Sequence, residues 1–248
     1  MKIRIKFAKY GVMKFIGHLD VMRFFQKAFR RAQIDIRYSE GFSPHPVMSF
    51  AAPLGVGLES MGEYLDIEVN TMTTEEEMKT ALNQTMAEGL RIISVKQLPE
   101  TAKNAMAGVA AAKYQITCLS GDGSPKEFPV EDLKMALRAF LEKERIPVIK
   151  KTKKGERELD LKPGIWELKA EEAIPPFDPD GRRYPAITML VDASSGGNIK
   201  PALVWDAFLT DCGITPESCS YQITRIETYG NTAPEGKTPE FVPLSEIY

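Results

Sequence analysis

The sequence lacks the features that define several large protein classes. Its 248 residues contain no run of about 18 apolar residues, so we expect no membrane-spanning helix. The N-terminal stretch MKIRIKFAKYGV alternates charged with apolar residues and has no apolar core of the kind that a secretory signal peptide carries. Only three cysteines occur, Cys118, Cys212 and Cys219, with no C-x-x-C pair, which excludes a disulfide framework. We therefore expect a protein of the reducing cytoplasm, with no membrane partner.

Several sequence motifs of catalysis and cofactor binding are also missing. There is no Walker motif, no H-E-x-x-H and no G-x-S-x-G. The run Gly55-x-Gly57-x-x-Ser60 lacks a third glycine and opens no helix, which argues against a dinucleotide site. Cys212 and Cys219 have no histidine near them in the sequence to complete a zinc site. We expect no cofactor and no metal, and a binding protein more than an enzyme.

The composition is typical of a globular protein, with 43% hydrophobic and 27% charged residues. The net charge of −2 conceals an uneven distribution, because residues 1–45 contain ten Lys and Arg against three Asp and Glu. This balance of +7 leaves −9 for the other 203 residues. Such asymmetry favours a polyanion or an acidic partner for the N-terminal part, although charges that are merely solvated would give the same count.

The order of the predicted helices and strands repeats once along the chain. Residues 2–9 alternate with period two, and residues 19–32 place their apolar side chains on one helical face. Further strands are expected over 46–54, 63–69 and 90–98, and a second helix over 75–87. After a linker over 101–112, strands are expected over 113–119, 146–151, 186–191 and 221–229, with helices over 130–143 and 201–211. This order predicts an α+β protein of two tandem ferredoxin-like (βαββαβ) domains with antiparallel sheets, over 1–100 and 113–230, followed by an irregular tail over 231–248.

The first predicted helix carries a stripe of positive charge. Arg23, Lys27, Arg30 and Arg31 fall within one arc of the helix, opposite its phenylalanines. Asp20 falls in the same arc and is expected to pair with Arg23, which would weaken the stripe. A basic helix face suits contacts to phosphates, while the alternative is the ordinary solvated face of an amphipathic helix.

Both histidines of the chain flank that helix in the sequence. His18 precedes it, and His45 follows it in the segment Gly41-Phe42-Ser43-Pro44-His45-Pro46, where the prolines restrict the backbone. If the loop before the helix and the approach to the next strand meet at one end of the sheet, His18 and His45 would serve as general acid and base or bind a phosphate. Ser43 and His45 are therefore candidate phosphate ligands. The alternative is that each histidine caps or fills a loop.

A second basic cluster lies in the segment VIKKTKKGERELDLKPG. Lys150, Lys151, Lys153 and Lys154 stand between two predicted strands, and residues 145–162 carry a local charge of +4. A projecting hairpin or loop at this place would suit a nucleic-acid backbone. A solvated loop without a ligand is the alternative.

Residues 15–60 resemble the signature of a bacterial family of domains of unknown function that is linked to radical-SAM proteins, as a companion of, or a C-terminal fusion to, cobalamin-binding radical-SAM enzymes. The similarity rests on the pieces GHLD at 17–20, RRA at 30–32, GFSPHP at 41–46, LGVGLES at 54–60, and KKTKKGERELDLKPGI at 150–165. The resemblance implies a radical-SAM enzyme as partner and RNA as a possible substrate. This chain has no C-x-x-x-C-x-x-C motif with which to hold an iron–sulfur cluster itself.

Three functions are therefore open. The first is a non-catalytic companion of a radical-SAM enzyme that binds RNA or presents the substrate. The second is a metal-independent endoribonuclease that uses His18 or His45, by analogy of fold with CRISPR repeat-processing enzymes. The third is a protein–protein adaptor with no role in nucleic-acid binding.

Overall fold

The structure, a computed structural model, describes residues 1–120, 126, 129–152 and 155–248, and only the backbone of residues 150–152. It divides into two compact units, Met1–Ala110 with Glu227–Tyr248, and Ala111–Ile226. The end of the last long strand and the C-terminal residues thus belong to the first unit. Within the described residues, no helix has both the length and the hydrophobicity needed to cross a membrane.

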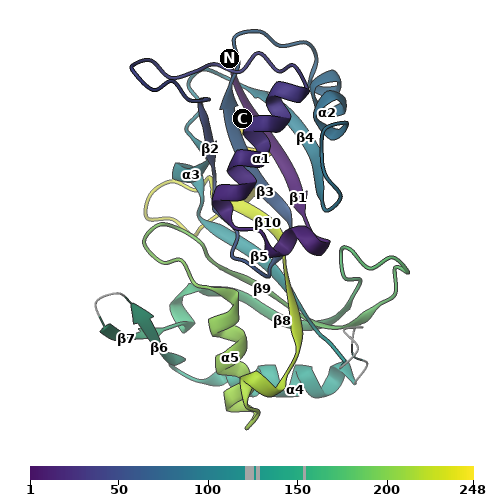
Figure 1. Cartoon of the computed structure of the whole chain (residues 1–248). Helices are drawn as coiled ribbons and strands as arrows, with labels where there is room; N and C mark the ends of the chain where they lie inside the picture. The colour runs from purple at the N-terminus through teal and green to yellow at the C-terminus, as the bar shows by residue number, and fades with distance from the viewer. Residues whose placement is uncertain (121–125, 127–128, 153–154) are drawn as a thin grey trace. The chain divides into compact units, whose positions relative to one another are not determined.

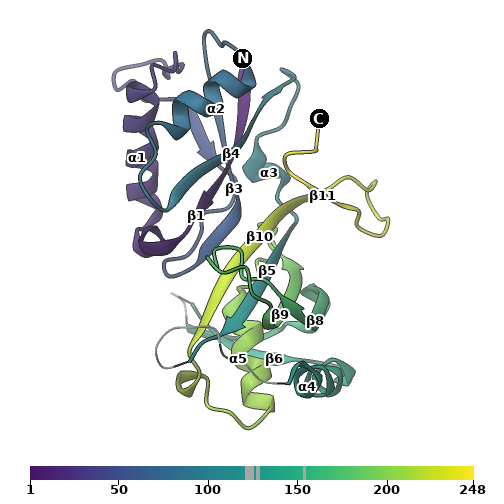
Figure 2. The same cartoon turned by 90° about the vertical axis from the view of Figure 1, so that its right-hand side faces the viewer.

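The first unit contains two helices packed on one side of an antiparallel sheet (Figures 1 and 2). Strand β1 pairs with both β3 and β4, and β2 pairs with β3. The short helix α3 and the C-terminal segment lie on the other side of these strands (Figure 2). The elements, in chain order, are β1 (Lys2–Lys9), the 3-10 turn η1 (Gly11–Phe15), α1 (His18–Arg31), β2 (Met48–Phe50), β3 (Glu59–Glu68), α2 (Glu75–Asn83), β4 (Leu90–Leu98), α3 (Ala105–Gly108) and β11 (Phe241–Pro243).

The alternation of β1 decides which side of the sheet is apolar. Ile3, Ile5 and Phe7 are fully buried among side chains of α1, and the Phe7 ring meets Phe25 edge-on at 4.9 Å. The intervening side chains of β1, which include Arg4, point to the opposite face of the sheet. One face of this sheet is therefore a hydrophobic core and the other is polar.

The second unit contains the remaining elements. Strand β9 pairs antiparallel with β5 and β8, while β6 and β7 form a separate two-stranded hairpin. Helices α4 and α5 pack through Phe140 and Phe208, whose rings are 5.7 Å apart. The elements are β5 (Ala111–Cys118), α4 (Val130–Glu142), β6 (Pro147–Thr152), β7 (Gly155–Asp160), the 3-10 turn η2 (Lys162–Gly164), β8 (Ile165–Ala173), β9 (Tyr184–Asp192), α5 (Pro201–Asp211), the 3-10 turn η3 (Pro216–Ser218) and β10 (Tyr221–Asn231).

Hydrogen bonds join nine strands into one mixed sheet. Its order is β4-β1-β3-β10-β5-β9-β8, with β2 also on β3 and β11 also on β10. The α+β class is thus confirmed, but the expectation of two separate antiparallel sheets is corrected to a single sheet. The reason is the length of β10, whose residues through Ile226 belong to the second unit and those from Glu227 to the first.

The strand expected over 146–151 does not join this sheet. Residues Pro147–Thr152 pair with β7 instead, and the strand beside β9 is β8, within a stretch that appears polar in the sequence. In β8, the buried Leu168 and Ala170 alternate with the charged residues Glu167, Lys169 and Glu171. Because of these alternating charges, the sequence of this half-buried strand resembles that of a polar loop.

Candidate nucleic-acid interface

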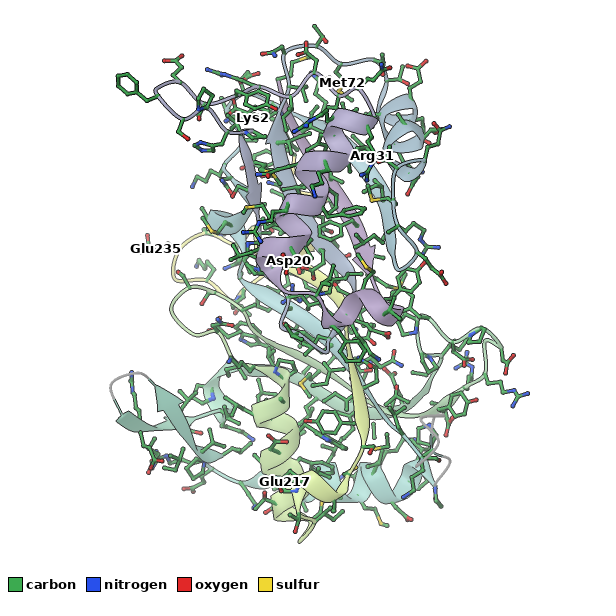
Figure 3. All side chains as sticks on the ribbon, viewed as in Figure 1. Lys2, Asp20, Arg31, Met72, Glu217 and Glu235 are labelled. Atoms are coloured by element: carbon green, nitrogen blue, oxygen red, sulfur yellow. The ribbon has the colours of Figure 1, made fainter. Side chains whose placement is uncertain are left out.

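Helix α1 separates its apolar residues from its basic residues as the sequence predicts. Val21, Phe25, Ala28 and Phe29 are buried against the sheet, while the four basic residues of the stripe are exposed. Figure 3 marks Asp20 and Arg31 near opposite ends of this helix. The fourteen residues of α1 give the exposed face a length of about 20 Å.

The four cations of α1 differ in what they contact. Arg23 lies 3.2 Å from the Asp20 carboxylate, as the sequence predicts. The Arg31 guanidinium donates to the carbonyl of Thr85 at 3.0 Å and stacks over the Phe24 ring. Within the residues that the structure describes, no ion-pair or hydrogen-bond partner holds the side chains of Lys27 and Arg30. These two side chains are the ones free to meet an anionic ligand.

The other cations of residues 1–45 have partners inside the first unit. Six of them belong to β1, to the turn after it, or to the segment that leads to β2. Two of them donate to backbone carbonyl oxygens, Lys2 to those of Glu100 and Ala102 and Lys9 to that of Ile16. The other four pair with carboxylates: Arg4 with Asp66, Lys6 with Glu227, Lys14 with Glu59, and Arg37 with Glu68. The positive balance of +7 therefore overstates the charge that a ligand would meet.

The loop over residues 39–45 is closed by contacts between its two ends. The Ser39 amide donates to the His45 carbonyl at 2.9 Å, and the His45 amide donates to the Ser39 hydroxyl at 3.1 Å. The Ser39 hydroxyl also lies 2.9 Å from the His45 ring nitrogen Nδ1. This closure leaves Phe42 fully exposed, with a relative accessibility of 111%. His45 thus braces the loop, and the aromatic side chain at its tip is free to contact a partner.

The structure does not bring His18 and His45 together. His18 begins α1, and its ring meets Phe50 edge-on at 4.9 Å in a small pocket that Lys9 and Glu63 also line. His45 precedes β2, beyond the bridge that joins Tyr38 to Pro46. Since Phe50 is four residues after Pro46 along an extended chain, the Cα atoms of Pro46 and Phe50 are about 13 Å apart. The arrangement offers no acid–base pair made of the two histidines.

The second basic cluster lies partly in a hairpin. Lys150 and Lys151 belong to β6 and pair in register with Arg157 and Glu156 of β7. Lys153 and Lys154 lie outside the described residues. The predicted place of the cluster, in a hairpin, is thus confirmed for the backbone of Lys150 and Lys151.

The polar face of the first unit holds a buried charge network that the sequence did not reveal. The Arg4 guanidinium is 2% exposed and binds both oxygens of Asp66, at 2.8 and 3.0 Å. It also donates to the carbonyl of Leu244 at 2.8 Å, so that it holds the C-terminal segment on the sheet. The only signal in the sequence was the charge at alternate positions of β1, which equally fits a solvated face.

A second part of this network surrounds Tyr64. Its hydroxyl donates to the Glu227 carboxylate at 2.7 Å, and Lys6 forms an ion pair with the same carboxylate. Burial, and to a lesser degree the Glu227 charge, raises the pKa of the Tyr64 hydroxyl well above its usual value. Since these groups satisfy one another, the network has the character of a structural element more than of an open site.

Most of the chain matches the profile of a protein family. The profile of a bacterial family described as "Uncharacterized protein conserved in bacteria (DUF2344)" matches residues 2–201, which include α1, the braced loop and the β6–β7 hairpin. No curated protein matches the chain. Because the match covers most of its length, the chain belongs to the bacterial family DUF2344.

Proposed function

We propose that this protein is a non-catalytic, RNA-binding or substrate-presenting companion of a radical-SAM enzyme. The observation that carries the proposal is the pair of exposed side chains on α1, Lys27 and Arg30, which the fold holds on a rigid helix without partners among the described residues. Cations placed in this way bind phosphates with a gain from counterion release. The exposed Phe42 supplies an aromatic ring on which an unpaired base stacks.

The strand order supports a finer description of the fold. In the first unit β4, β1, β3 and β2 are neighbours in that order, and in the second half of the chain the corresponding order is β10, β5, β9 and β8. Both follow the sequence fourth, first, third, second of a βαββαβ motif, if the β6–β7 hairpin is counted as an insertion. We infer that each half is ferredoxin-like.

The partner enzyme is the part of the proposal that rests on resemblance alone. The pieces GHLD, GFSPHP and LGVGLES are similar to those of a radical-SAM-linked family, and this chain has no cysteine motif for a cluster of its own. The partner would supply the radical chemistry, while this chain would hold the RNA. Co-expression with a radical-SAM enzyme from the same genome, followed by co-purification, tests this part.

The RNA part is tested by direct binding. Labelled tRNA or rRNA fragments are titrated with the purified protein between 50 and 200 mM salt, and we expect the affinity to fall steadily with salt. Affinity that does not change over this range, or no binding at the lower salt concentration, would contradict the proposal. An incubation of the same RNA in EDTA tests the endoribonuclease alternative, which the separation of His18 from His45 does not support.

A specific observation favours the adaptor as second candidate. Val12 and Phe15 of the turn η1, Leu19 of α1 and Val56 are large apolar side chains with 59 to 74% of their surface exposed. Gly57 donates to the carbonyl of Lys14 at 2.8 Å, which brings the segment of Val56 beside η1. Exposed apolar groups of this kind mark protein interfaces. Co-purification with a protein partner without retention of RNA would favour the adaptor.

A further inference from the structure

The three cysteines of the chain, which are far apart in the sequence, line one pocket of the second unit. Cys118 is the last residue of β5, Cys212 follows α5, and Cys219 follows the turn η3. The pocket has a volume of about 290 Å³, and its other walls are mostly apolar, formed by Leu133, Ala136, Trp205, Phe208, Leu209 and Ile214. A pocket of this size admits a small molecule to the thiols.

Two of the three thiols lie on neighbouring segments of the chain. The Cys219 thiol donates to the carbonyl of Ser220 at 3.8 Å. The segments of Cys118 and Cys219 are joined by the bond from the Leu119 amide to the Ser220 carbonyl at 2.8 Å, at the end of β5 and the entry to β10. Cys118 is buried and Cys219 is half-buried. Cys212 lines the same pocket, where burial raises the pKa of its thiol and the charge of Lys143 opposes the increase.

We propose that Cys118 and Cys219 form a thiol pair, which a low-molecular-weight disulfide such as oxidised glutathione converts to an intramolecular disulfide. The site is a modification site independent of the RNA-binding function. It would fasten the end of β5 to the chain that enters β10, and thiol reductants would reopen it.

The reaction proceeds in two exchange steps. The Cys219 thiol loses its proton to solvent, its sulfur attacks one sulfur of oxidised glutathione, and the first glutathione leaves as a thiolate. The Cys118 thiol then loses its proton, and its sulfur attacks the Cys219 sulfur and releases the second glutathione. Each leaving thiolate takes up a proton. Two protein thiols are thereby oxidised, and one glutathione disulfide is reduced to two glutathione molecules.

The order of the steps follows from exposure and from ionisation. Cys219 reaches the solvent and therefore meets the oxidant first. Burial and the adjacent Cys219 raise the pKa of the Cys118 thiol to about 12, against a smaller opposite effect of Lys126. Because the thiolate is the nucleophile, the second step gains speed with rising pH throughout the range below that pKa.

The test is mass spectrometry of the whole purified protein after incubation with oxidised glutathione. After digestion without reductant, we expect a cross-link between the peptides of Cys118 and Cys219 that is two hydrogen atoms lighter than their sum, whatever adduct forms at the exposed Cys212. The matched control Cys212→Ser should form the same bridge, because Cys212 takes no part. Cys118→Ser should form no bridge and should carry glutathionyl groups on Cys219 and on the exposed Cys212.

Three results would overturn the proposal. They are a bridge that contains Cys212, a wild-type protein that keeps all its thiols, or one that accumulates only glutathione adducts as the pH is raised. The cross-linked peptides of the wild-type protein decide the question without any variant, so the test does not depend on the folding of Cys118→Ser.

Discussion

Neutralisation of Lys27 and Arg30 is the sharpest test of the basic face. The two changes Lys27→Gln and Arg30→Gln remove positive charge from exposed side chains that have no partner among the described residues. We therefore expect the free energy of unfolding to change by no more than about 0.5 kcal/mol. Circular dichroism and urea unfolding check this before binding is measured.

The size of the binding effect follows from the number of phosphate contacts removed. Each contact contributes a slope of about 0.7 to 0.9 in log affinity against log salt, so a fourfold rise in salt weakens binding by about 2.6- to 3.5-fold per contact. If Lys27 and Arg30 each meet one phosphate, the factor by which affinity falls between 50 and 200 mM salt should be about seven to twelve times larger for the wild type than for the double variant. Filter binding or fluorescence anisotropy with labelled RNA measures both slopes.

Two matched variants make the result specific to this face. Lys134→Gln removes an exposed charge of the same kind from α4, where Lys134 pairs with Glu131 at 2.7 Å, and should leave the slope unchanged. Asp20→Asn releases Arg23 from its ion pair and should steepen the slope by about one contact. Equal slopes for the wild type and the double variant, or an equal effect of Lys134→Gln, would refute the argument.

Three further predictions concern the packing and the loop. Asp66→Ala leaves the Arg4 charge buried without its carboxylate and should lower the free energy of unfolding in urea by about 3 to 5 kcal/mol. The double variant with Arg4→Met should recover most of this loss. A loss below about 1 kcal/mol in the single variant would show that the pair is unimportant to stability. Phe42→Ala should weaken binding of single-stranded RNA by about 1 to 3 kcal/mol and that of duplex RNA far less, and an equal loss for both would exclude base stacking. Because the folded-state pKa of Cys118 is raised from 9.0 to about 12, the stability that it contributes is present below pH 9 and is lost as the pH rises toward 12. The fall in unfolding free energy above pH 9 should be smaller in Cys118→Ala, and identical profiles would count against the burial of this thiol.

Elements bounded by glycine and proline could be predicted from the sequence. The strand expected over 90–98 is β4 with the same bounds, and the helix expected over 201–211 is α5. Strand β4 lies between Gly89 and Pro99, and α5 begins at Pro201 and is followed by Gly213. Local interactions determine such elements, so the local sequence contains the information.

Other elements depend on partners that are distant in the sequence. Strand β8 stands at the edge of the sheet and carries Glu167, Lys169 and Glu171 between its buried residues, a charge pattern that edge strands use against aggregation. Cys118 and Cys219 are about a hundred residues apart in the sequence, and their segments become neighbours because β5 and β10 are adjacent in the sheet. No local pattern encodes either feature.

The count of charges in residues 1–45 illustrates the same limit for function. Eight of the ten cations have partners in the first unit, two of these being Arg23 and Arg31 on α1 itself, so a formal balance of +7 leaves Lys27 and Arg30 as the cations without one among the described residues. Two phosphate contacts alone give weak binding that salt disrupts only modestly. RNA held firmly by this protein would therefore need contacts from elsewhere, either from the lysines at 150–154 or from the partner enzyme. We accordingly expect the affinity for RNA to rise when the radical-SAM partner that we propose is present, and to remain low for this chain alone.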